Sequence, residues 1–419
     1  MSSPAPAGRP RGGLSRRQAL AGLGIALAGG VVGRAALAGG AGARGAVTQA
    51  EMTRAAAAQA PRVQATVAQA TVAPARHARA ALAAGLTNLQ LAGQRVIGSY
   101  SGLTPPASLL TDIENGQLAG VIFFGGNISS ETQIAGVITQ LRQAQAQSPV
   151  QLPLLLMTDQ EGGLVRRLPG APALSEKQIG QSSNPVAAAT TAGTGAGQNL
   201  AGVGMNVNLA PVLDVFYKSG NFIDQYQRSY SSNPAVAAEC GQAFITAQQQ
   251  TGVAATAKHF PGLGSATKNQ NTDNGPVTLT VSLTKLRTVD EVPYPPAISA
   301  GVKLVMVSWA IYPTLDAKLP AGLSPVVIGQ ELRGRNAFTG VTITDALEAG
   351  ALSAFGPTAQ RAVTAAGAGM DLILCSAQDP SQGEAATAAL ASALGSGQLD
   401  PVAFNAAVNR VTALRAGVF

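Results

Sequence analysis

"PLLLMTDQ", residues 153–160, is an apolar run that ends abruptly in polar residues, and it sets the pattern for the fold. Its apolar residues are continuous and do not alternate with polar ones, as they would in a strand with one solvated face. Continuous apolar strands are typical of parallel sheets, because protein covers both faces of such a sheet. Similar runs, each bounded by Gly, Asp or Pro, occupy residues 95–100, 119–126, 204–214, 252–262, 302–313, 340–348 and 368–376.

The segments between these runs favour helix. Stretches rich in Ala, Gln and Leu with helical spacing include Glu131–Gln147, Pro234–Gln250 and Gln360–Gly367. Strands that alternate with helices in this way predict an α/β fold, a (β/α)8 TIM-type barrel that forms a single catalytic domain over residues 83–419. A doubly wound open sheet is the alternative. It is weakened because no G-x-G-x-x-G motif opens a helix after the first strand.

Residues 1–38 have the features of an export signal peptide. Arg16 and Arg17 precede a short Ala/Gly/Leu stretch, and small residues near Ala36 and Ala38 form a cleavage pattern, so the signal resembles the twin-arginine type. The apolar stretch is too short and too rich in glycine to span ~30 Å of hydrocarbon. We therefore expect a secreted protein with no stable membrane insertion after cleavage. Residues 39–82 are rich in Ala, Gln and Thr and predict a disordered linker.

The positive charge of the chain belongs to this leader. Residues 1–80 contain ten Arg and a single acid, Glu51. Removing them from the totals of 28 Lys and Arg and 21 Asp and Glu leaves 18 and 20, a net charge of about −2 for the remainder. Binding to nucleic acid requires a basic patch on a folded face. Residues 81–419 contain no basic run, so no nucleic-acid partner is expected.

The scarcity of histidine and cysteine limits the chemistry. The predicted barrel contains one histidine, His259, and two cysteines, Cys240 and Cys375, whose apolar neighbours favour buried free thiols over a disulfide. A zinc site needs several such ligands, and the G-x-S-x-G elbow of a serine hydrolase is missing. We therefore expect no metal and no organic cofactor. Hydrolysis by paired carboxylates remains, and that is the chemistry of glycosidases.

Polar residues at the ends of the apolar runs are candidates for the active site, because the site of a (β/α)8 barrel lies at the carboxyl ends of its strands. These residues are Asp159, Asp214, Lys258, His259, Trp309 and Asp345.

Several linked motifs resemble glycoside hydrolase family 3 in order and spacing. They are "LLLMTDQEGGLVRRL" (154–168), "LAPVLDV" (209–215), "QRSYSSNP" (227–234), "AKHFPGLG" (257–264), "YP" (312–313) and "GVTITDAL" (340–347). The nearest branch looks like the single-domain bacterial β-N-acetylglucosaminidases that trim peptidoglycan fragments. The resemblance implies an exported retaining β-glycosidase that acts on terminal β-linked sugars, with β-N-acetylglucosaminides of cell-wall fragments as the first choice of substrate. A monomer is expected.

The resemblance also implies roles for single residues. Asp345 matches the nucleophile that forms a covalent glycosyl-enzyme. Asp159 matches an acid that binds sugar hydroxyls, and Lys258 with His259 matches the pair that binds the sugar. For His259, a buried histidine bonded to the backbone is the alternative.

Two arginines and two further aspartates match positions in the same pattern. Arg167 and Arg228 match arginines that hold hydroxyls and help to keep the nucleophile ionised, since a nearby cation lowers the pKa of a carboxyl group. Asp214 and Asp371 resemble structural aspartates that cap loops at strand ends.

The loop after the fifth strand departs from the family pattern. The acetylglucosaminidase branch has an Asp-Ser-His acid/base motif where this chain has Asn269, Gln270 and Asn271. Amides do not titrate near neutral pH, so the aspartate–histidine pair that serves as acid and base in the family is absent from these positions. A two-residue insertion would bring Asp273 into the histidine's place, where an enclosed sugar site would raise its pKa and let it protonate a leaving group. Alternatively, Asp273 belongs to a turn in "NTDNG" (271–275).

Two other departures concern neighbours of the site. Trp309 stands where the branch usually has histidine, and both stacking on a sugar and a place in the core are open interpretations. Ala346 follows the nucleophile where many relatives have a second acid. Because the acid/base pair is missing, two alternatives to a β-N-acetylglucosaminidase stay open. The protein is then a catalytically impaired sugar-binding protein, or else a β-glucosidase or transglycosylase.

Overall fold

The computed structural model describes residues 85–418. The predicted export signal (1–38) and the predicted linker (39–82) lie outside the described residues. Between residues 85 and 418, no helix is both long enough and apolar enough to cross a membrane.

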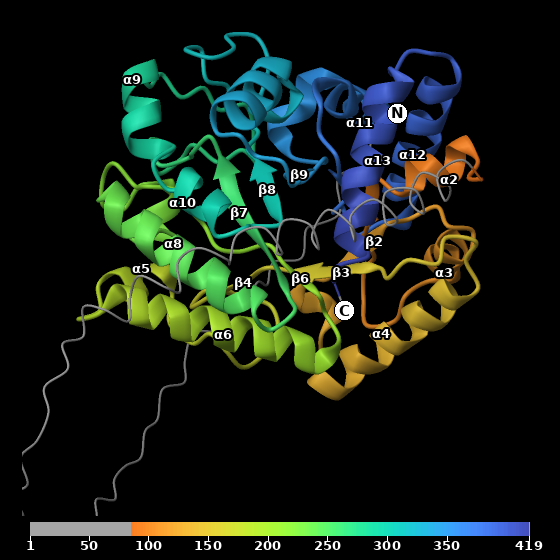
Figure 1. The fold of residues 1–419 in the computed structure, drawn as a ribbon, viewed down its shortest axis with the longest axis horizontal. Coiled ribbons are helices and arrows are strands. Elements are labelled where there is room, and N and C mark those ends of the chain that lie inside the picture. Colours follow the sequence, from red (N-terminus) through yellow and green to blue (C-terminus); the bar gives the residue numbers. More distant parts are fainter. Residues whose placement is uncertain (1–84, 419) are drawn as a thin grey trace, which may run out of the picture. The chain divides into compact units, whose positions relative to one another are not determined.

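Eight parallel strands form the centre of the fold (Figure 1), in the order β10-β1-β2-β3-β6-β7-β8-β9. A bridge between Ile343 and Leu372 joins β9 to the start of β10, and Thr344 donates a backbone hydrogen bond of 3.0 Å to Leu372. The first and last strands of the order therefore meet, which confirms the barrel and excludes an open sheet. The strands are β1 (Val96–Gly98), β2 (Gly120–Ile122), β3 (Leu155–Thr158), β6 (Val207–Asn208), β7 (Ala254–Phe260), β8 (Leu304–Val307), β9 (Val341–Thr344) and β10 (Ile373–Leu374).

Each predicted apolar run contains one of these strands, but the strands are shorter than the runs because the polar ends leave the sheet as loops. A small antiparallel hairpin, which the sequence pattern did not reveal, follows β3; its strands are β4 (Gln160–Gly162) and β5 (Val165–Arg166).

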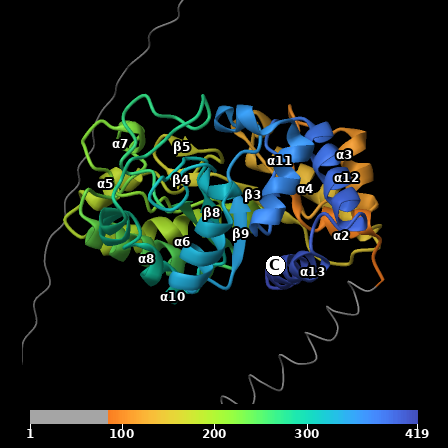
Figure 2. The same ribbon diagram turned by 90° about the horizontal axis from the view of Figure 1, so that it is seen from above.

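Helices surround the strands (Figures 1 and 2), as the alternating pattern predicted. They are α2 (Asn88–Gly93), α3 (Ala107–Glu114), α4 (Glu131–Ala146), α5 (Glu176–Gly180), α6 (Pro185–Val203), α7 (Phe222–Gln225), α8 (Pro234–Gln249), α9 (Leu283–Lys285), α10 (Tyr294–Ser299), α11 (Thr358–Ala368), α12 (Pro380–Gly395) and α13 (Pro401–Arg415). Shorter 3₁₀ turns cover Gly125–Asn127, Ala321–Leu323 and Gly350–Phe355, and π-helical segments cover Leu286–Asp290 and Val326–Arg335.

The long helices begin at sequence signals that are easy to recognise. An Asn or Asp followed by Pro starts α6, α8, α12 and α13, and in each case the side chain of the cap accepts a backbone N–H of the first turn. The cap satisfies a donor that the helix leaves free, and Pro has no N–H to lose at this position. Gly204 and Gly369 end α6 and α11 with φ of 90° and 106°, a conformation that favours glycine.

The strands pack on both of their faces. Leu155 and Met157 of β3 point into a cluster to which all eight strands contribute, whereas Leu154 and Leu156 belong to the layer under the helices. Side chains of α13 join the inner cluster, so this helix closes one end of the barrel.

Arg415 shows which end of the barrel α13 closes. Its guanidinium donates bonds of 2.8 Å to the carbonyls of Pro153 and Leu152, just before β3. Helix α13 thus lies at the amino ends of the strands, and the carboxyl ends stay free for a site.

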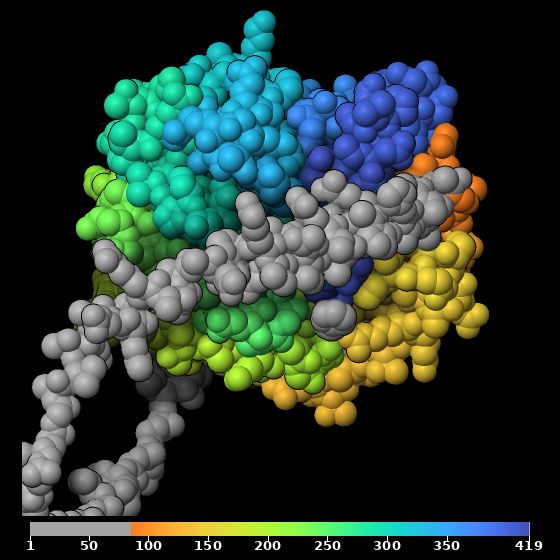
Figure 3. Space-filling view, viewed as in Figure 1, coloured from red at the N-terminus to blue at the C-terminus, as the bar shows by residue number. Residues whose placement is uncertain are grey.

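Helices from the two ends of the described chain also meet. Helix α2 packs against α12, and Figure 3 shows these orange and blue segments side by side. Cys240 and Cys375 are both buried free thiols, which confirms the prediction made for them.

Candidate active site

A cavity of about 220 Å³ opens at the carboxyl ends of the strands and contains most of the predicted site. Its lining includes seven of the eight residues predicted to act in catalysis or binding: Asp159, Arg167, Arg228, Lys258, His259, Asp273 and Asp345. Asp159 follows β3 and Asp345 follows β9, while Lys258 and His259 lie in β7. The remaining wall is mostly apolar and includes Ile122, Phe124, Leu209, Met306 and Leu374.

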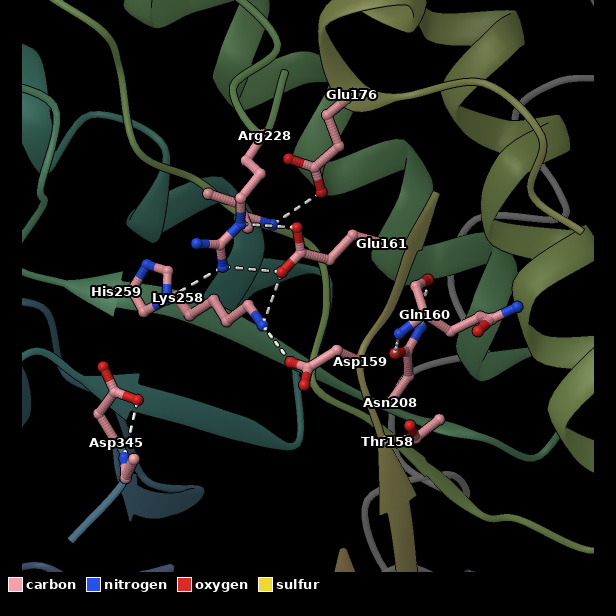
Figure 4. A network of polar contacts seen from close by, with 12 residues as sticks. Thr158, Asp159, Gln160, Glu161, Glu176, Asn208, Arg228, Lys258, His259 and Asp345 are labelled. Atoms are coloured by element: carbon pink, nitrogen blue, oxygen red, sulfur yellow. Dashed lines mark hydrogen bonds and ion pairs between the residues drawn. The ribbon is translucent and has the colours of Figure 1, made fainter. Parts of the chain in front are cut away.

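Two cations and two carboxylates form a network on one side of this pocket (Figure 4). Lys258 Nζ lies 2.7 Å from Asp159 Oδ1 and 2.8 Å from Glu161 Oε1. Arg228 donates to both oxygens of Glu161, from Nε at 2.9 Å and from Nη2 at 2.8 Å. Glu161 therefore joins the lysine and the arginine that the sequence pattern had singled out separately.

Glu161 was missed by the sequence analysis. Only 1% of it is exposed. Burial by itself raises the pKa of Glu161, but the charges and hydrogen bonds of Arg228 and Lys258 outweigh burial and lower the pKa to about 2. Its position could have indicated its role. Glu161 comes two residues after Asp159, and alternate residues of an extended chain face the same side.

The same network keeps both cations charged. Burial lowers the pKa of Lys258, but Asp159 and Glu161 more than compensate, so the pKa is raised. Burial by itself lowers the pKa of Arg228, but the charge and hydrogen bonds of Glu161 together with the charges of Asp159 and Asp214 outweigh burial, so the pKa is raised. Both cations line the cavity, so they can donate to hydroxyl groups of a ligand.

A second buried acid, Glu176, lies next to Arg228 at the upper edge of the network in Figure 4, and the sequence pattern did not single it out. Its Oε1 accepts the backbone N–H of Val212 at 2.8 Å. Burial and the nearby charge of Glu161 raise its pKa well above the usual range. Both effects favour the protonated form of Glu176, because an ionised Glu176 would place a second buried negative charge beside Glu161.

His259 is oriented by Asp214. The ring Nδ1 lies 2.7 Å from Asp214 Oδ2, and Asp214 Oδ1 also accepts the backbone N–H of Leu263 at 2.7 Å. The ring Nε2 faces Arg228 Nη2 at 3.5 Å. Because arginine only donates and a carboxylate only accepts, this arrangement assigns the ring proton to Nδ1. The contacts of the ring are thus with the side chains of Asp214 and Arg228 and not with the backbone. The bond from Leu263 N–H to Asp214 is the loop-capping contact expected of this aspartate.

The carboxylates of Asp345 and Asp273 come from two neighbouring loops. Asp345 Oδ1 accepts the N–H of Ala346 at 2.8 Å. The loop that carries Asp273 is held to the segment after β9, because Gly350 donates to Asp273 O and Ala351 to Thr272 O, each at 2.9 Å. A Cβ on Gly350 would lie 2.6 Å from the backbone of Asn274, so a larger residue would push the loops apart.

Asp273 takes part in a turn, and it also lines the pocket, so each of the two interpretations of this residue agrees with part of the structure. Its N–H donates to Asn271 Oδ1 at 2.8 Å, as in an Asx turn. Its side chain is solvent-accessible at the rim of the pocket. Partial burial of the carboxyl group and repulsion by Asp345 raise the pKa of Asp273, against the opposing charges of His259 and Arg228.

Trp309 does not line the cavity, so the prediction that it stacks on a sugar is wrong. Its side chain has no exposed area, and its Nε1 donates to Ala346 O at 2.8 Å. Gly322 packs against its ring face, where a Cβ would lie 2.5 Å from the indole. The tryptophan therefore belongs to the core and supports the loop that follows Asp345.

Asp371 lies away from the pocket. It pairs with Arg333 at 2.6 Å and Arg410 at 2.7 Å and accepts the N–H of Thr342, as expected of a structural residue. Among residues 85–418, no three His, Cys, Asp or Glu side chains are grouped so that they could hold a metal ion.

Comparisons with known proteins agree with the barrel and its motifs. The sequence pattern described as "Glycosyl hydrolase family 3 N terminal domain" matches residues 67–414. An "Uncharacterized secreted glycosyl hydrolase" of Arthroderma benhamiae is 46% identical over 341 residues, which cover 80% of this chain and 96% of that protein. "Beta-hexosaminidase A" of Pseudoalteromonas piscicida is 30% identical over 377 residues, 81% of this chain and 62% of that longer protein.

A solved structure has the same architecture. The beta-N-acetylhexosaminidase of Beutenbergia cavernae superimposes with a TM-score of 0.72 at 30% identity, over 79% of this chain and 98% of that one. The match covers nearly all of the other protein. The chain therefore belongs to glycosyl hydrolase family 3, and it is a glycosyl hydrolase built on a single (β/α)8 barrel.

Proposed function

We propose that this protein is a secreted retaining β-glycosidase that removes terminal β-linked sugars, with β-N-acetylglucosaminides of cell-wall fragments as its first substrates. The observation that carries the proposal is the presence of Asp345 and Asp273 in the lining of one pocket, on loops tied to each other. The names of the hexosaminidase relatives support the sugar. The name of the Arthroderma benhamiae relative and the twin arginine support secretion.

The basic residues and Asp159 bind the sugar in this proposal. Arg167 Nε is buried without a hydrogen-bond partner among the described residues, so a ligand hydroxyl would satisfy it. Lys258, Arg228 and His259 present further polar groups to the same cavity. A buried donor without a protein partner favours binding of a molecule that accepts hydrogen bonds, such as a sugar.

Asp345 and Asp273 carry out the chemistry. The Asp345 oxygen that does not accept from Ala346 attacks the anomeric carbon, and Asp273 donates its proton to the glycosidic oxygen as the carbon–oxygen bond breaks. The alcohol leaves, and an ester between the sugar and Asp345 remains. Asp273, now ionised, removes a proton from water, whose oxygen attacks the anomeric carbon and releases Asp345. Two inversions give net retention of configuration.

The test compares leaving groups. Asp345→Asn is expected to abolish release of 4-nitrophenol from the β-N-acetylglucosaminide. Asp273→Asn is expected to slow methyl glycosides at least 100-fold and the aryl glycoside far less, because a good leaving group needs little protonation. The acid must be protonated, so wild-type kcat/KM falls as pH rises through the raised pKa of Asp273. This limb of the pH profile disappears in Asp273→Asn.

Azide separates the two roles. With an activated substrate, azide attacks the glycosyl-enzyme of Asp273→Ala and yields the β-glycosyl azide, whereas it replaces the nucleophile of Asp345→Ala and yields the α-glycosyl azide. Equal slowing of both leaving groups in Asp273→Asn would reject Asp273 as the acid. Sugar binding without any hydrolysis would favour the alternative of an impaired binding protein. Faster hydrolysis of the 4-nitrophenyl β-glucoside would assign a β-glucosidase, and transfer to a sugar acceptor in place of water a transglycosylase.

A further inference from the structure

The carboxylate of Asp345 is oriented by the residue that follows it and not by the charged network of the pocket. Figure 4 shows Asp345 apart from Lys258, Arg228 and Glu161, and none of the bonds drawn there joins it to them. Among the described residues, its carboxylate accepts a single hydrogen bond, from the N–H of Ala346 at 2.8 Å. The direction of the carboxylate therefore depends on the backbone at Ala346.

The peptide group between Ala346 and Leu347 is held at both of its ends. Its carbonyl, Ala346 O, accepts the Nε1–H of Trp309 at 2.8 Å. Its N–H, on Leu347, donates to Leu374 O at 3.0 Å. A peptide group is planar, so a bond at each end fixes the plane. Trp309 follows β8 and Leu374 lies in β10, so both neighbours of β9 hold the segment that begins with Asp345.

The indole of Trp309 is itself fixed in place. The side chain is fully buried. The 3₁₀ turn Ala321–Leu323 donates backbone bonds of 2.9 and 3.1 Å to the carbonyls of Ala310 and Ser308, the residues on either side of Trp309. The same turn brings Gly322 against the ring, where a Cβ would lie 2.5 Å from the indole. The ring therefore has little room to turn, and its N–H is held in one direction.

We propose that Trp309 is a positioning residue for the nucleophile. Its N–H fixes the peptide group that follows Ala346 and, through the N–H of Ala346, the direction of the Asp345 carboxylate. The inference rests on the proposed function, in which an oxygen of Asp345 attacks the anomeric carbon. Trp309 acts without touching the sugar, because it does not line the cavity. Reacting atoms must lie about 3–3.5 Å apart and in line, so a small displacement of the attacking oxygen lowers the rate.

Trp309→Phe separates positioning from packing, because phenylalanine keeps an aromatic ring and removes the N–H. Its kcat/KM on 4-nitrophenyl β-N-acetylglucosaminide is expected to fall about tenfold, since a misplacement of about 1 Å costs up to about 100-fold. The inhibition constant of N-acetylglucosamine is expected to stay within twofold of wild type, because the groups that bind the sugar keep their contacts. Val411→Ala also removes buried volume, but at the opposite end of the barrel, and its kcat/KM is expected to stay within twofold.

Azide tests whether the effect of Trp309→Phe passes through Asp345. In Asp345→Ala, azide takes the place of the nucleophile. Adding Trp309→Phe to Asp345→Ala is expected to leave the azide-dependent rate within twofold, because the group that Trp309 positions is already gone. A general distortion of the pocket would slow this rate about tenfold as well. The two substitutions are thus expected to be non-additive, as for residues that act as one unit.

Gly322→Ala moves the indole without removing its N–H, so it is a second route to the same effect. Its kcat/KM is expected to fall at least threefold, with the azide-dependent rate of Asp345→Ala unchanged by it. Gly329 has no atom within 4 Å of the place of a Cβ, so Gly329→Ala is the matched control and is expected to equal wild type.

The outcomes distinguish this inference from the proposed function. Hydrolysis that requires Asp345, with kcat/KM of folded Trp309→Phe and Gly322→Ala within twofold of wild type, would overturn the role of Trp309 alone. Equal slowing of the azide-dependent reaction by Trp309→Phe would also overturn it, since the effect would not pass through Asp345. Full activity of Asp345→Ala without azide, or no hydrolysis by the wild type, would overturn the proposed function and this inference with it.

Discussion

Glu161 is the residue on which the charged side of the pocket depends. It is nearly inaccessible and contacts both Lys258 and Arg228. Lys258 and Arg228 with no carboxylate between them would repel each other and lose their hydrogen bonds. A buried charge without its partner costs far more than an exposed one. Glu161 is therefore a positioning residue for the two cations that face the cavity.

Glu161→Gln is expected to lower the free energy of unfolding at pH 7 by about 3 kcal/mol. The pKa of Glu161 falls from its ordinary 4.5 to about 2 in the folded protein. A depressed pKa stabilises the folded state above pH 4.5, and this stabilisation is lost as the pH falls toward 2. The difference between wild type and variant should therefore shrink over that window, as measured by urea unfolding at several pH values.

Glu114→Gln is the control for this prediction, because Glu114 is exposed on helix α3. Its stability is expected to match wild type at every pH. A difference between Glu161→Gln and wild type that persists unchanged at pH 2.5 would show that the ionised form of Glu161 is not the source of the stability.

At the scale of elements, helices α6 and α8 show how small residues set the packing distance. Gly193 of α6 lies against the backbone of α8, and a Cβ there would meet Phe244 O at 2.3 Å. Glycine usually weakens a helix by about 1 kcal/mol relative to alanine. Its use in the middle of α6 is explained by the close approach of the two helices, which alanine would prevent.

Gly193→Ala is expected to destabilise the protein by about 1–3 kcal/mol, since the helices must move apart to admit a methyl group. Gly202, in the same helix, has no atom within 4 Å of the place of a Cβ. Gly202→Ala is therefore expected to stabilise by about 0.5 kcal/mol through helix propensity alone. Denaturant unfolding measures both, and equal effects of the two substitutions would contradict the packing argument.

At the scale of the whole molecule, one end of the barrel is filled by side chains that stabilise the fold, and the other end holds the active-site pocket. Helix α13 fills the end at the amino termini of the strands, with Val411 fully buried in the inner cluster. The pocket lies at the other end, as the rule for such barrels requires. Changes in α13 should therefore affect the free energy of unfolding without changing the arrangement of the catalytic groups.

Val411→Ala is expected to cost about 2 kcal/mol of stability through lost burial and the cavity it leaves. Its kcat/KM on 4-nitrophenyl β-N-acetylglucosaminide is expected to stay within twofold of wild type at 25 °C. Val402 is 78% exposed on the same helix, so Val402→Ala is expected to be neutral in both measurements. A large loss of kcat/KM in folded Val411→Ala would mean that the two ends of the barrel are coupled.

The sequence by itself determined the barrel and the positions of Asp159, Lys258, His259 and Asp345. Continuous apolar runs specify parallel strands, and parallel strands in a barrel bring their polar ends to one rim, so local pattern was sufficient. The caps of α6, α8, α12 and α13 are equally local, since a cap residue bonds to its own first turn.

The tertiary structure alone decided which side chains pair. Glu161 and Glu176 became neighbours of Arg228 only through folding, and the hairpin of β4 and β5 that carries Glu161 is too short to give a pattern. Trp309 lies in the core because Gly322 and Ala346 pack on it, which its place at a strand end did not reveal. Asp273 reached the pocket because its loop bonds to Gly350 and Ala351. Contacts between residues far apart in the chain depend on closure of the barrel, and no local pattern of residues encodes them.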